Sequence, residues 1–169
     1  MTEKTKNTEI QTSLPISIII CARNEKANLQ KNLAYILNQV YEHNGANNFE
    51  VLVVNDNSRD DSIYYLRELV KSNAHLNILN LEQESQSMKG KKFPLSMGIK
   101  QSKYEHILLT DADCVPNSKN WLAEMVQPFY EGKEIVIGYA PYNKEKTKLN
   151  RNIRYETFYA ALQYLSMAL

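Results

Sequence analysis

Short apolar segments alternate with longer segments of helical periodicity along this chain, and this alternation limits the possible fold more than any other feature. The apolar segments are bounded by turn residues, as is typical of β-strands, and they cover residues 16–20, 51–54, 76–81, 107–110 and 134–139. Between them, apolar residues recur at helical spacing over residues 29–40, 63–70, 94–99 and 121–129. Because strands that alternate with helices are joined by right-handed crossovers, the sequence predicts an α/β fold with a mostly parallel sheet flanked by helices.

The pattern divides the chain into three regions. Residues 1–13 are polar without a hydrophobic period, which predicts a disordered tail. Residues 14–142 contain all the predicted strands and form one domain, in which Asn44-Gly45 is expected to end the first helix after Val40. Residues 143–169 read as a basic loop followed by the start of another helix, rich in apolar and aromatic side chains. Because that helix stops without a cap, we expect the chain to be a piece of a longer protein.

Composition excludes several classes of protein. With 20 Lys and Arg against 19 Asp and Glu, the 169 residues carry a net charge of +1, which gives no electrostatic case for nucleic acid as a partner. Residues 1–13 lack the apolar core of a signal peptide, and no apolar stretch approaches the roughly 18 residues that a membrane span needs. Cys21 and Cys114 lack the spacing of a metal site or a disulfide framework. Free thiols of this kind indicate a reducing compartment, the cytoplasm.

The segment ILLTDAD at residues 107–113 carries the strongest functional signal. It predicts a strand buried on both faces that ends in two carboxylates, Asp111 and Asp113. Ligands of open α/β sheets bind outside the carboxyl ends of the strands. Two carboxylates placed there favour a divalent metal, Mg²⁺ or Mn²⁺, that shares its oxygen ligands with a phosphate-bearing substrate. The alternative is a pair of solvated loop carboxylates or a helix cap.

Polar side chains also follow the first two predicted strands, with Glu25 after the first and Asp56 after the second. Because parallel strands end at one edge, these side chains are expected to converge with Asp111 and Asp113. Asp56 can accept hydrogen bonds from a base or a ribose. Glu25 lies near a helix start, so helix capping is its alternative role.

A polar loop at residues 82–92 precedes the short helix that Pro94 is expected to start. Its lysines, Lys89, Lys91 and Lys92, can neutralise a diphosphate, and an ordinary solvated loop is the alternative. Gly90 and Gly98 permit close approach of the backbone.

Other catalytic patterns are missing. No Gly-x-Gly-x-x-Gly follows the first strand and no P-loop sequence occurs, which argues against a dinucleotide-binding domain and a P-loop enzyme. None of the three histidines falls at the carboxyl end of a predicted strand, so no Ser/His/Asp arrangement is indicated.

Taken together, four of these segments resemble family 2 glycosyltransferases, which have the GT-A fold. The matching segments, in the family's order and with family-like spacing, are residues 15–25, 53–60, 90–98 and 108–113. The resemblance extends over about residues 14–142. It implies a Rossmann-like, mostly parallel sheet, a nucleotide-diphosphate sugar donor linked to uridine or guanosine, and Mg²⁺ or Mn²⁺ as cofactor.

The resemblance also implies roles for individual residues. Asp56 resembles the carboxylate that recognises the base, and Asp111 resembles the residue near the ribose and donor sugar. Asp113 resembles the direct metal ligand, and Asp111 belongs to the metal site beside it. The full donor-binding set is Ala22, Glu25, Asp56, Lys91 and Asp111. One position departs from the pattern, because Asn55 stands where the family commonly has an Asp.

Inverting members of the family use a further carboxylate that deprotonates the acceptor hydroxyl. Nothing after Ile137 resembles it, since Glu145 and Glu156 lack the family's context, so we expect the catalytic base to lie outside this chain. The resemblance implies an acceptor hydroxyl on a saccharide or lipid-linked molecule, with residues 143–169 leading to the acceptor side. It also implies attachment of the parent protein to the cytoplasmic face of a membrane.

Three hypotheses follow for the function. The first is an inverting glycosyltransferase of which this chain holds mainly the donor half. The second is a nucleotide-sugar-binding fragment without turnover. The third, a sugar nucleotidyltransferase, is disfavoured because the loop at residues 21–25 has no glycine to hold a triphosphate.

Overall fold

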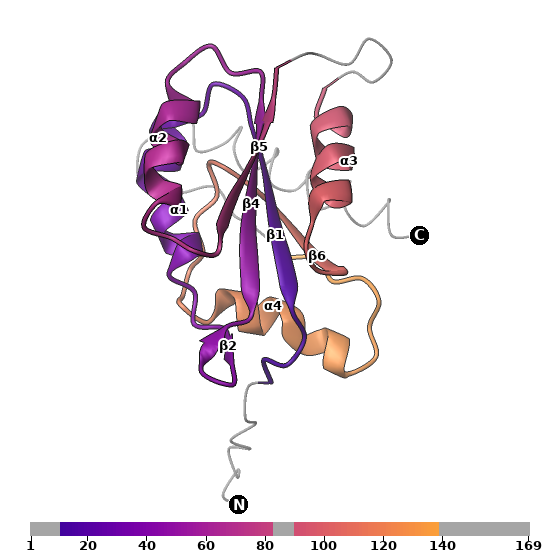
Figure 1. Cartoon of the computed structure of the whole chain (residues 1–169). Helices are drawn as coiled ribbons and strands as arrows, with labels where there is room; N and C mark the ends of the chain where they lie inside the picture. Colours follow the sequence, from indigo (N-terminus) through magenta and orange to yellow (C-terminus); the bar gives the residue numbers. More distant parts are fainter. Residues whose placement is uncertain (1–10, 83–89, 139–169) are drawn as a thin grey trace, which may run out of the picture.

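The computed structural model describes residues 11–82 and 90–138. Four strands form a parallel sheet in the order β5-β4-β1-β6, and β2 and β3 form a separate hairpin (Figure 1). In chain order the elements are β1 (Ile16–Ala22), α1 (Lys26–Leu37), β2 (Glu42–His43), β3 (Ala46–Asn47), β4 (Phe49–Asp56), α2 (Ser62–Val70), β5 (Leu76–Leu81), α3 (Lys92–Gln101), β6 (His106–Asp111) and α4 (Trp121–Tyr130). The predicted α/β fold with a mostly parallel sheet is confirmed, and its four strands all finish at one edge.

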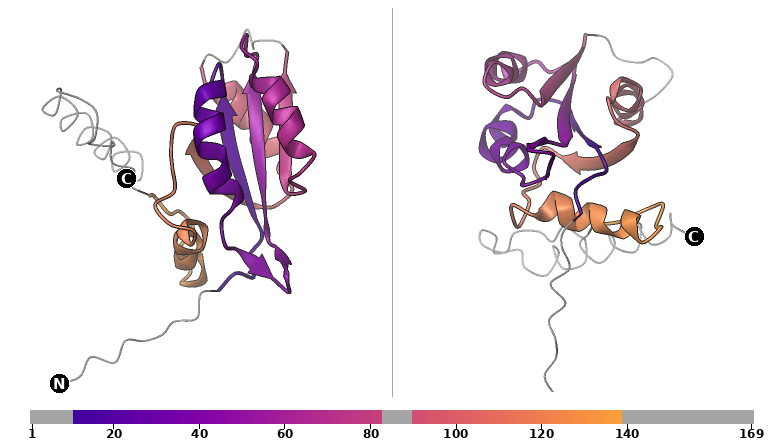
Figure 2. Two further views of the ribbon diagram at one scale, coloured as in Figure 1. Left: turned by 90° about the vertical axis from the view of Figure 1, so that its left-hand side faces the viewer. Right: turned by 60° about the horizontal axis from the view of Figure 1, so that its bottom comes forward.

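Helices cover both faces of the sheet (Figure 2). The face that carries Ile18 and Ile20 packs against α1, α2 and α4. The opposite face, with Ile19 and Val54, packs against α3 and forms a second, smaller core. Burial on both faces accounts for the continuous apolar sequences of β1 and β4.

Gly98 allows α3 to lie close to the sheet. A Cβ atom at this position would lie 2.9 Å from Ile19 Cγ2 and 3.0 Å from Val54 Cγ2. Both methyl groups belong to buried β-branched side chains with few rotamers, so they cannot move aside. The close approach expected at Gly98 is confirmed. Gly90 differs, because its φ of 68° serves a turn and a Cβ there would meet nothing within 4 Å among the described residues.

A buried carboxylate near the amino end of the sheet fixes the connection from α3 to β6. Glu50 on β4 is 4% exposed. It accepts hydrogen bonds from Ser17 Oγ at 2.6 Å, Asn77 Nδ2 at 2.8 Å and the backbone N–H of Lys103 at 2.5 Å. Ser17 Oγ in turn accepts from the N–H of Tyr104 at 3.0 Å. These bonds satisfy the buried charge and join three strands to the loop that precedes β6.

The end of the first helix differs from the prediction. α1 ends at Leu37, and Val40 is 53% exposed instead of lying on the buried helical face. Asn44 and Gly45 do not end the helix; they form the turn between β2 and β3, with φ values of 53° and 77°. Positive φ at both central residues is what a type I′ hairpin turn requires, and Asn-Gly supplies it at low cost.

Two strand predictions were wrong within the described residues. β6 was expected to be buried on both faces, but it is an edge strand of the described sheet and Leu109 is 53% exposed. Residues 134–138 form no strand, and Ile135 is 78% exposed, while Tyr139 lies outside the described residues. An apolar segment shows that a strand is possible, but it does not show which neighbour pairs with it.

The predicted tail and the predicted basic loop fall largely outside the described residues. Of the tail, residues 1–10 are outside, whereas the carbonyl of Thr12 accepts a hydrogen bond from Asn48 Nδ2 at 2.7 Å and Ser13 Oγ lies 3.2 Å from the Tyr130 hydroxyl. Residues 143–169 are entirely outside. None of the helices in the described ranges is long and apolar enough to cross a bilayer.

Candidate functional site

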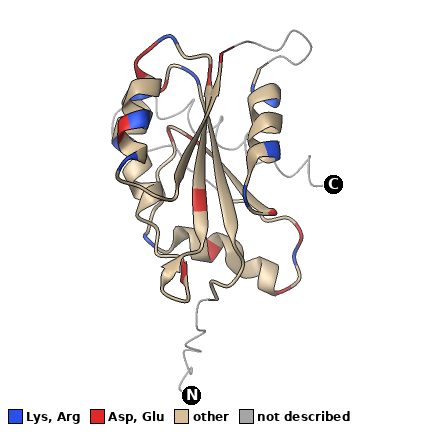
Figure 3. Cartoon of the chain, viewed as in Figure 1, with Lys and Arg blue, Asp and Glu red and all other residues tan. Residues whose placement is uncertain are grey.

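The carboxyl ends of β1, β4 and β6 line one cavity together with the start of α3. Figure 3 shows acidic and basic residues on the loops at this end of the sheet. The cavity is lined by the full donor-binding set and by both expected metal ligands, namely Ala22, Glu25, Asp56, Lys91, Asp111 and Asp113. Their predicted convergence is therefore confirmed, while the role of each stays a prediction.

A second cavity lies at the end of β5 and is lined by Asn80, Leu81, Glu82 and Phe93. Its volume is about 340 Å³, against about 160 Å³ for the first. The two are neighbours along the edge, because Leu81 pairs with Asp56 in the register of β4 and β5. The smaller cavity is the candidate site, since it gathers charges of both signs, whereas Glu82 is the one charged residue among the described residues that line the larger cavity.

Lys91 and Asp111 form an ion pair across the site, with Lys91 Nζ 2.7 Å from Asp111 Oδ1. The hydrogen bond from Lys91 to Asp111 raises the pKa of Lys91, and the nearby charge of Asp113 acts in the same direction. Both side chains are more than half exposed, so the pair adds little to the free energy of unfolding. A paired lysine at this place keeps a positive charge beside the two carboxylates. Lys92 lies in the first turn of α3, and Lys89 is outside the described residues.

Arg23 and Asp56 face each other on the β1 and β4 side of the cavity. Arg23 Nη1 lies 3.9 Å from Asp56 Oδ2, which is a loose ion pair. The Asp56 side chain is 15% exposed and that of Arg23 44%. Asp56 thus lines the cavity although most of its side chain is buried.

Two loops at this edge are joined by Asn24, a residue of the matching segment 15–25 to which the sequence analysis gave no role. Asn24 has a φ of 56°, in the left-handed region that Asn tolerates better than most residues. Its backbone N–H donates to Ser58 Oγ at 2.9 Å, and its Oδ1 accepts from the N–H of Arg59 at 2.7 Å. These bonds hold the loop after β1 against the loop after β4, so Glu25 and Asp56 stay at the same cavity.

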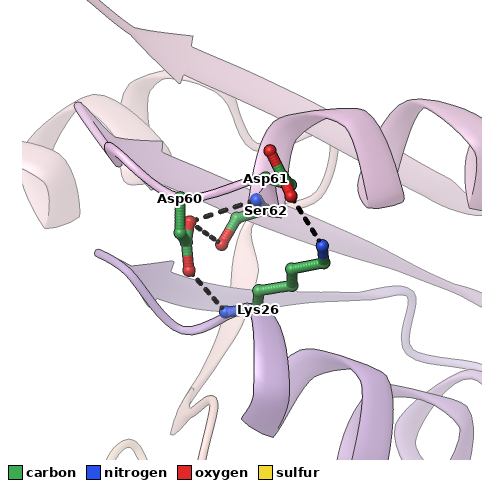
Figure 4. Close-up of polar contacts among 4 residues, drawn as sticks. All are labelled: Lys26, Asp60, Asp61 and Ser62. Atoms are coloured by element: carbon green, nitrogen blue, oxygen red, sulfur yellow. Dashed lines mark hydrogen bonds and ion pairs between the residues drawn. The ribbon is translucent and has the colours of Figure 1, made fainter.

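Asp60 joins the first turns of α1 and α2 (Figure 4). Its carboxylate accepts from the backbone N–H of Lys26 at 3.0 Å, and from the N–H and hydroxyl of Ser62 at 3.1 and 2.5 Å. Partial burial raises the pKa of Asp60, but the hydrogen bonds from Ser62 and Lys26 outweigh burial and the net pKa lies below the usual value. Asp61 lies beside it and pairs with Lys26 Nζ at 2.8 Å.

The capping alternative for Glu25 is not supported by these contacts. Glu25 occupies the N-cap position of α1, but its side chain makes no capping hydrogen bond. Instead Glu25 Oε2 accepts from Asn28 Nδ2 at 2.6 Å, and Asp60 serves the first N–H of the helix. The Glu25 carboxylate therefore remains part of the cavity wall.

Both cysteines are free thiols, as predicted, and both are half-buried. Cys21 lines the cavity, and burial raises the pKa of its thiol to about 11. Since the thiolate is the reactive form, the raised pKa keeps the Cys21 thiol mostly protonated near neutral pH and so less reactive than a free cysteine.

The carboxylates of the cavity fit a metal ion that the protein and a bound ligand coordinate together. Among the residues in the described ranges, no group of three or more His, Cys, Asp or Glu side chains could hold a metal ion by itself. Asp111 and Asp113 supply two carboxylates at the cavity. Mg²⁺ is typically bound through one or two carboxylates together with substrate phosphates and water, so this pair matches such a site. Glu145 and Glu156 lie outside the described residues, and the predicted lack of a catalytic base stays a prediction.

Comparison with curated proteins finds relatives that are named as synthases and glycosyltransferases. The chain is 36% identical over 106 residues to the beta-monoglucosyldiacylglycerol synthase of Nostoc sp., covering 62% of this chain and 22% of the relative. It is 31% identical over 100 residues to the poly-beta-1,6-N-acetyl-D-glucosamine synthase of Staphylococcus epidermidis, covering 59% and 22%. The match thus spans about a fifth of the length of these two relatives.

Solved structures show the same fold. The mannosyltransferase PcManGT from Pyrobaculum calidifontis, in complex with GDP-Man and Mn²⁺, superposes with a TM-score of 0.58 at 25% identity over 69% of this chain and 32% of its own. TarS from S. aureus, in complex with UDP-GlcNAc, superposes with a TM-score of 0.57 at 24% identity over 84% and 43%. These neighbours are GT-A glycosyltransferases, and the predicted GT-A fold is confirmed.

The family assignment rests on the chain as a whole. A family model described as "Glycosyl transferase family 2" matches residues 17–167, which include all the strand ends that line the cavity. With the motifs, the sheet order and the neighbouring structures in agreement, the chain belongs to glycosyl transferase family 2.

Proposed function

We propose that this chain carries the donor half of an inverting glycosyltransferase that moves a sugar from a UDP- or GDP-linked donor to an acceptor hydroxyl. The observation that carries the proposal is the convergence of the donor- and metal-assigned residues at one cavity. Family membership supports transferase chemistry, and the GDP-Man and Mn²⁺ bound by PcManGT support a nucleotide sugar with a divalent metal.

Different residues of the cavity wall contact different parts of the nucleotide-sugar donor. Asp56 accepts hydrogen bonds from N–H groups of the base, and Ala22 and Glu25 line the base and ribose. Lys91 neutralises the diphosphate as a point charge, which is the role that its position beside Asp111 suits. The protein thereby fixes the anomeric carbon for attack, a contribution of positioning.

Asp113, together with Asp111, holds the divalent metal in this proposal. When bound, the metal offsets the negative charge that builds on the departing diphosphate. Asp111 also borders the ribose and the donor sugar, and its pair with Lys91 keeps its carboxylate turned to the cavity.

The acceptor is proposed to be a hydroxyl group on a saccharide or a lipid-linked molecule. The names of the Nostoc and Staphylococcus relatives, one a diacylglycerol-modifying synthase and the other a polysaccharide synthase, support these two classes. In the full-length protein we place the domain in the cytoplasm at the membrane face, as the family resemblance implies.

A sugar nucleotidyltransferase fits the loop after β1 poorly. Such an enzyme needs free backbone N–H groups there to hold a triphosphate. The N–H of Asn24 donates to Ser58 Oγ, and the N–H of Lys26 donates to Asp60. Both groups are therefore occupied by the chain itself.

Titration calorimetry of UDP and GDP into the chain, first with Mn²⁺ and then with EDTA, tests the proposal. We expect one nucleotide to bind with Mn²⁺ and to lose most of its affinity in EDTA. Binding of neither nucleotide, by a chain that unfolds cooperatively, would contradict the proposal. Metal-dependent binding without sugar transfer to any acceptor would identify the chain as a donor-binding fragment without turnover.

A further inference from the structure

Two buried amide side chains hold the segment between β6 and α4 against the first helix and the residues that follow it. Asn32 on α1 is 3% exposed, and its Nδ2 donates to the carbonyl of Ala112 at 2.9 Å. Gln39 is 5% exposed, donates to the carbonyl of Ser118 at 2.9 Å and accepts from the N–H of Leu122 at 2.9 Å. The two amides therefore anchor opposite ends of one segment.

The Asn32 hydrogen bond acts on the turn that carries both cavity carboxylates. The N–H of Cys114 donates to the carbonyl of Asp111 at 3.1 Å, which closes a turn over residues 111–114. Ala112 and Asp113 occupy its two central positions. The carbonyl that Asn32 holds belongs to the peptide between them, and rotation of this peptide is what separates type I from type II turns.

A type I turn keeps both central residues at negative φ, whereas types I′ and II′ would place Ala112 at positive φ. Type II would place Asp113 at positive φ, and the described non-glycine residues with positive φ are Asn24, Asn44 and Asn57. The central peptide is therefore not in the type II orientation. By holding the Ala112 carbonyl, Asn32 opposes its rotation and so sets the direction in which the Asp113 side chain leaves the backbone.

The same amide contributes little net stability. Asn32 Oδ1 is buried without a hydrogen-bond partner among the described residues. An unpartnered buried acceptor destabilises the folded state and offsets the gain from the Nδ2 bond. Gln39 differs, because both its amide nitrogen and its oxygen are bonded.

We infer that Asn32 is a positioning residue for the divalent metal, acting through the Ala112 carbonyl on the turn that presents Asp111 and Asp113. The inference rests on the proposed function, because the metal is part of that proposal. Residues that orient metal ligands without touching the metal change metal affinity by about 10–100-fold when substituted.

The test is Asn32→Leu, which keeps nearly the same shape but removes the donor. The dissociation constant of the nucleotide that the wild-type chain binds is measured with Mn²⁺ and with EDTA, alongside the melting temperature. We expect the Mn²⁺-dependent affinity to fall about 10–100-fold. The affinity in EDTA stays unchanged, and the melting temperature changes little.

Gln39→Leu is the matched control, because it removes an equally buried amide from the far end of the same segment. It should lower the melting temperature more than Asn32→Leu while leaving the Mn²⁺ dependence intact. Asn32→Ala, which cannot clash, carries the same expectation for the Mn²⁺-dependent affinity if the leucine variant does not fold, but the cavity that it leaves lowers the melting temperature.

The possible results distinguish a failure of the Asn32 inference from a failure of the proposed function. An unchanged Mn²⁺ dependence in a folded Asn32 variant overturns the inference alone. An equal loss of Mn²⁺ dependence in the Gln39 control also overturns it, since general loosening of the segment would then suffice. A wild-type chain that binds no nucleotide with Mn²⁺ overturns the proposed function and this inference together.

Discussion

At the scale of single residues, the two carboxylates of the cavity turn have different surroundings. Asp111 is held by Lys91 at 2.7 Å. Asp113 has no ion pair within the described part of the chain, and its Oδ1 lies 3.8 Å from Cys114 Sγ, a weak donor. An unpaired carboxylate is the better direct ligand for an incoming cation, since no cation of the protein has to be displaced.

Asp113→Asn tests this assignment. The substitution keeps the shape of the side chain and removes its charge, so the gain in nucleotide affinity that Mn²⁺ provides should disappear, while the affinity in EDTA is unchanged. Calorimetric titration under both conditions measures the difference. Glu68→Gln, at an exposed carboxylate of α2 outside the cavity, should retain the full Mn²⁺ effect. Full Mn²⁺ enhancement in Asp113→Asn would rule out the residue as the ligand.

At the scale of the elements, Asp60 fixes the first turns of α1 and α2 to each other. One carboxylate serves backbone N–H groups of two helices, where the partial positive charge of the helix ends favours it. The contact joins residues 34 positions apart, so it orients the loops after β1 and β4 as one unit.

Asp60→Asn should lower the free energy of unfolding by about 1–2 kcal/mol near neutral pH, because an amide nitrogen then faces the N–H donors. The pKa of Asp60 is lower in the folded chain than its usual 3.8. The stability that the Asp60 carboxylate contributes is therefore fully present above the unfolded-state pKa, and it is lost as the pH falls through the folded-state pKa.

Chemical denaturation at pH 7 and at about pH 3 measures this dependence, and the gap between wild type and Asp60→Asn should narrow at the lower pH. Asp61→Asn is the control. It removes only an exposed ion pair and should change stability by less than about 1 kcal/mol. A gap that widens in acid would contradict the assignment.

At the scale of the whole molecule, the sheet order places the ends of β1, β4 and β6 side by side. A ligand at this edge contacts several elements at once, so it binds the folded chain and not the unfolded one. Mn²⁺ with the preferred nucleotide should therefore raise the melting temperature. At 100 times the dissociation constant, linkage predicts about 2.7 kcal/mol of added stability.

Thermal unfolding with nucleotide and Mn²⁺, compared with nucleotide and EDTA, measures this linkage. The shift should grow with nucleotide concentration and should be small in EDTA. A melting temperature that changes with neither nucleotide nor metal, in a chain that unfolds cooperatively, would argue against a site at this edge.

Several features could be predicted because they depend on local pattern. The buried strands β1 and β4, the short strand β5 and the apolar face of α2 follow from periodicity. The convergence of Glu25, Asp56, Asp111 and Asp113 followed from one rule, that parallel strands end at one edge. The features that were predicted wrongly depend instead on which segments pair in the folded chain. The Asn-Gly pair signals a turn, but the sequence did not show that the turn joins β2 to β3.

The amino-acid sequence by itself determined the alternation of strands and helices and the residue types at the strand ends, since each depends on neighbours a few positions away. The order and spacing of its motifs along the chain determined the family. Only the tertiary structure decided that β6 lies at the edge of the described sheet, and which side-chain amides and carboxylates hold the site. Asp60 reaches Lys26 across 34 positions, and Asn32 reaches Ala112 across 80. The physical reason is that such partners are chosen by packing: a buried polar group bonds to whatever the fold brings within reach, and no local period encodes that choice.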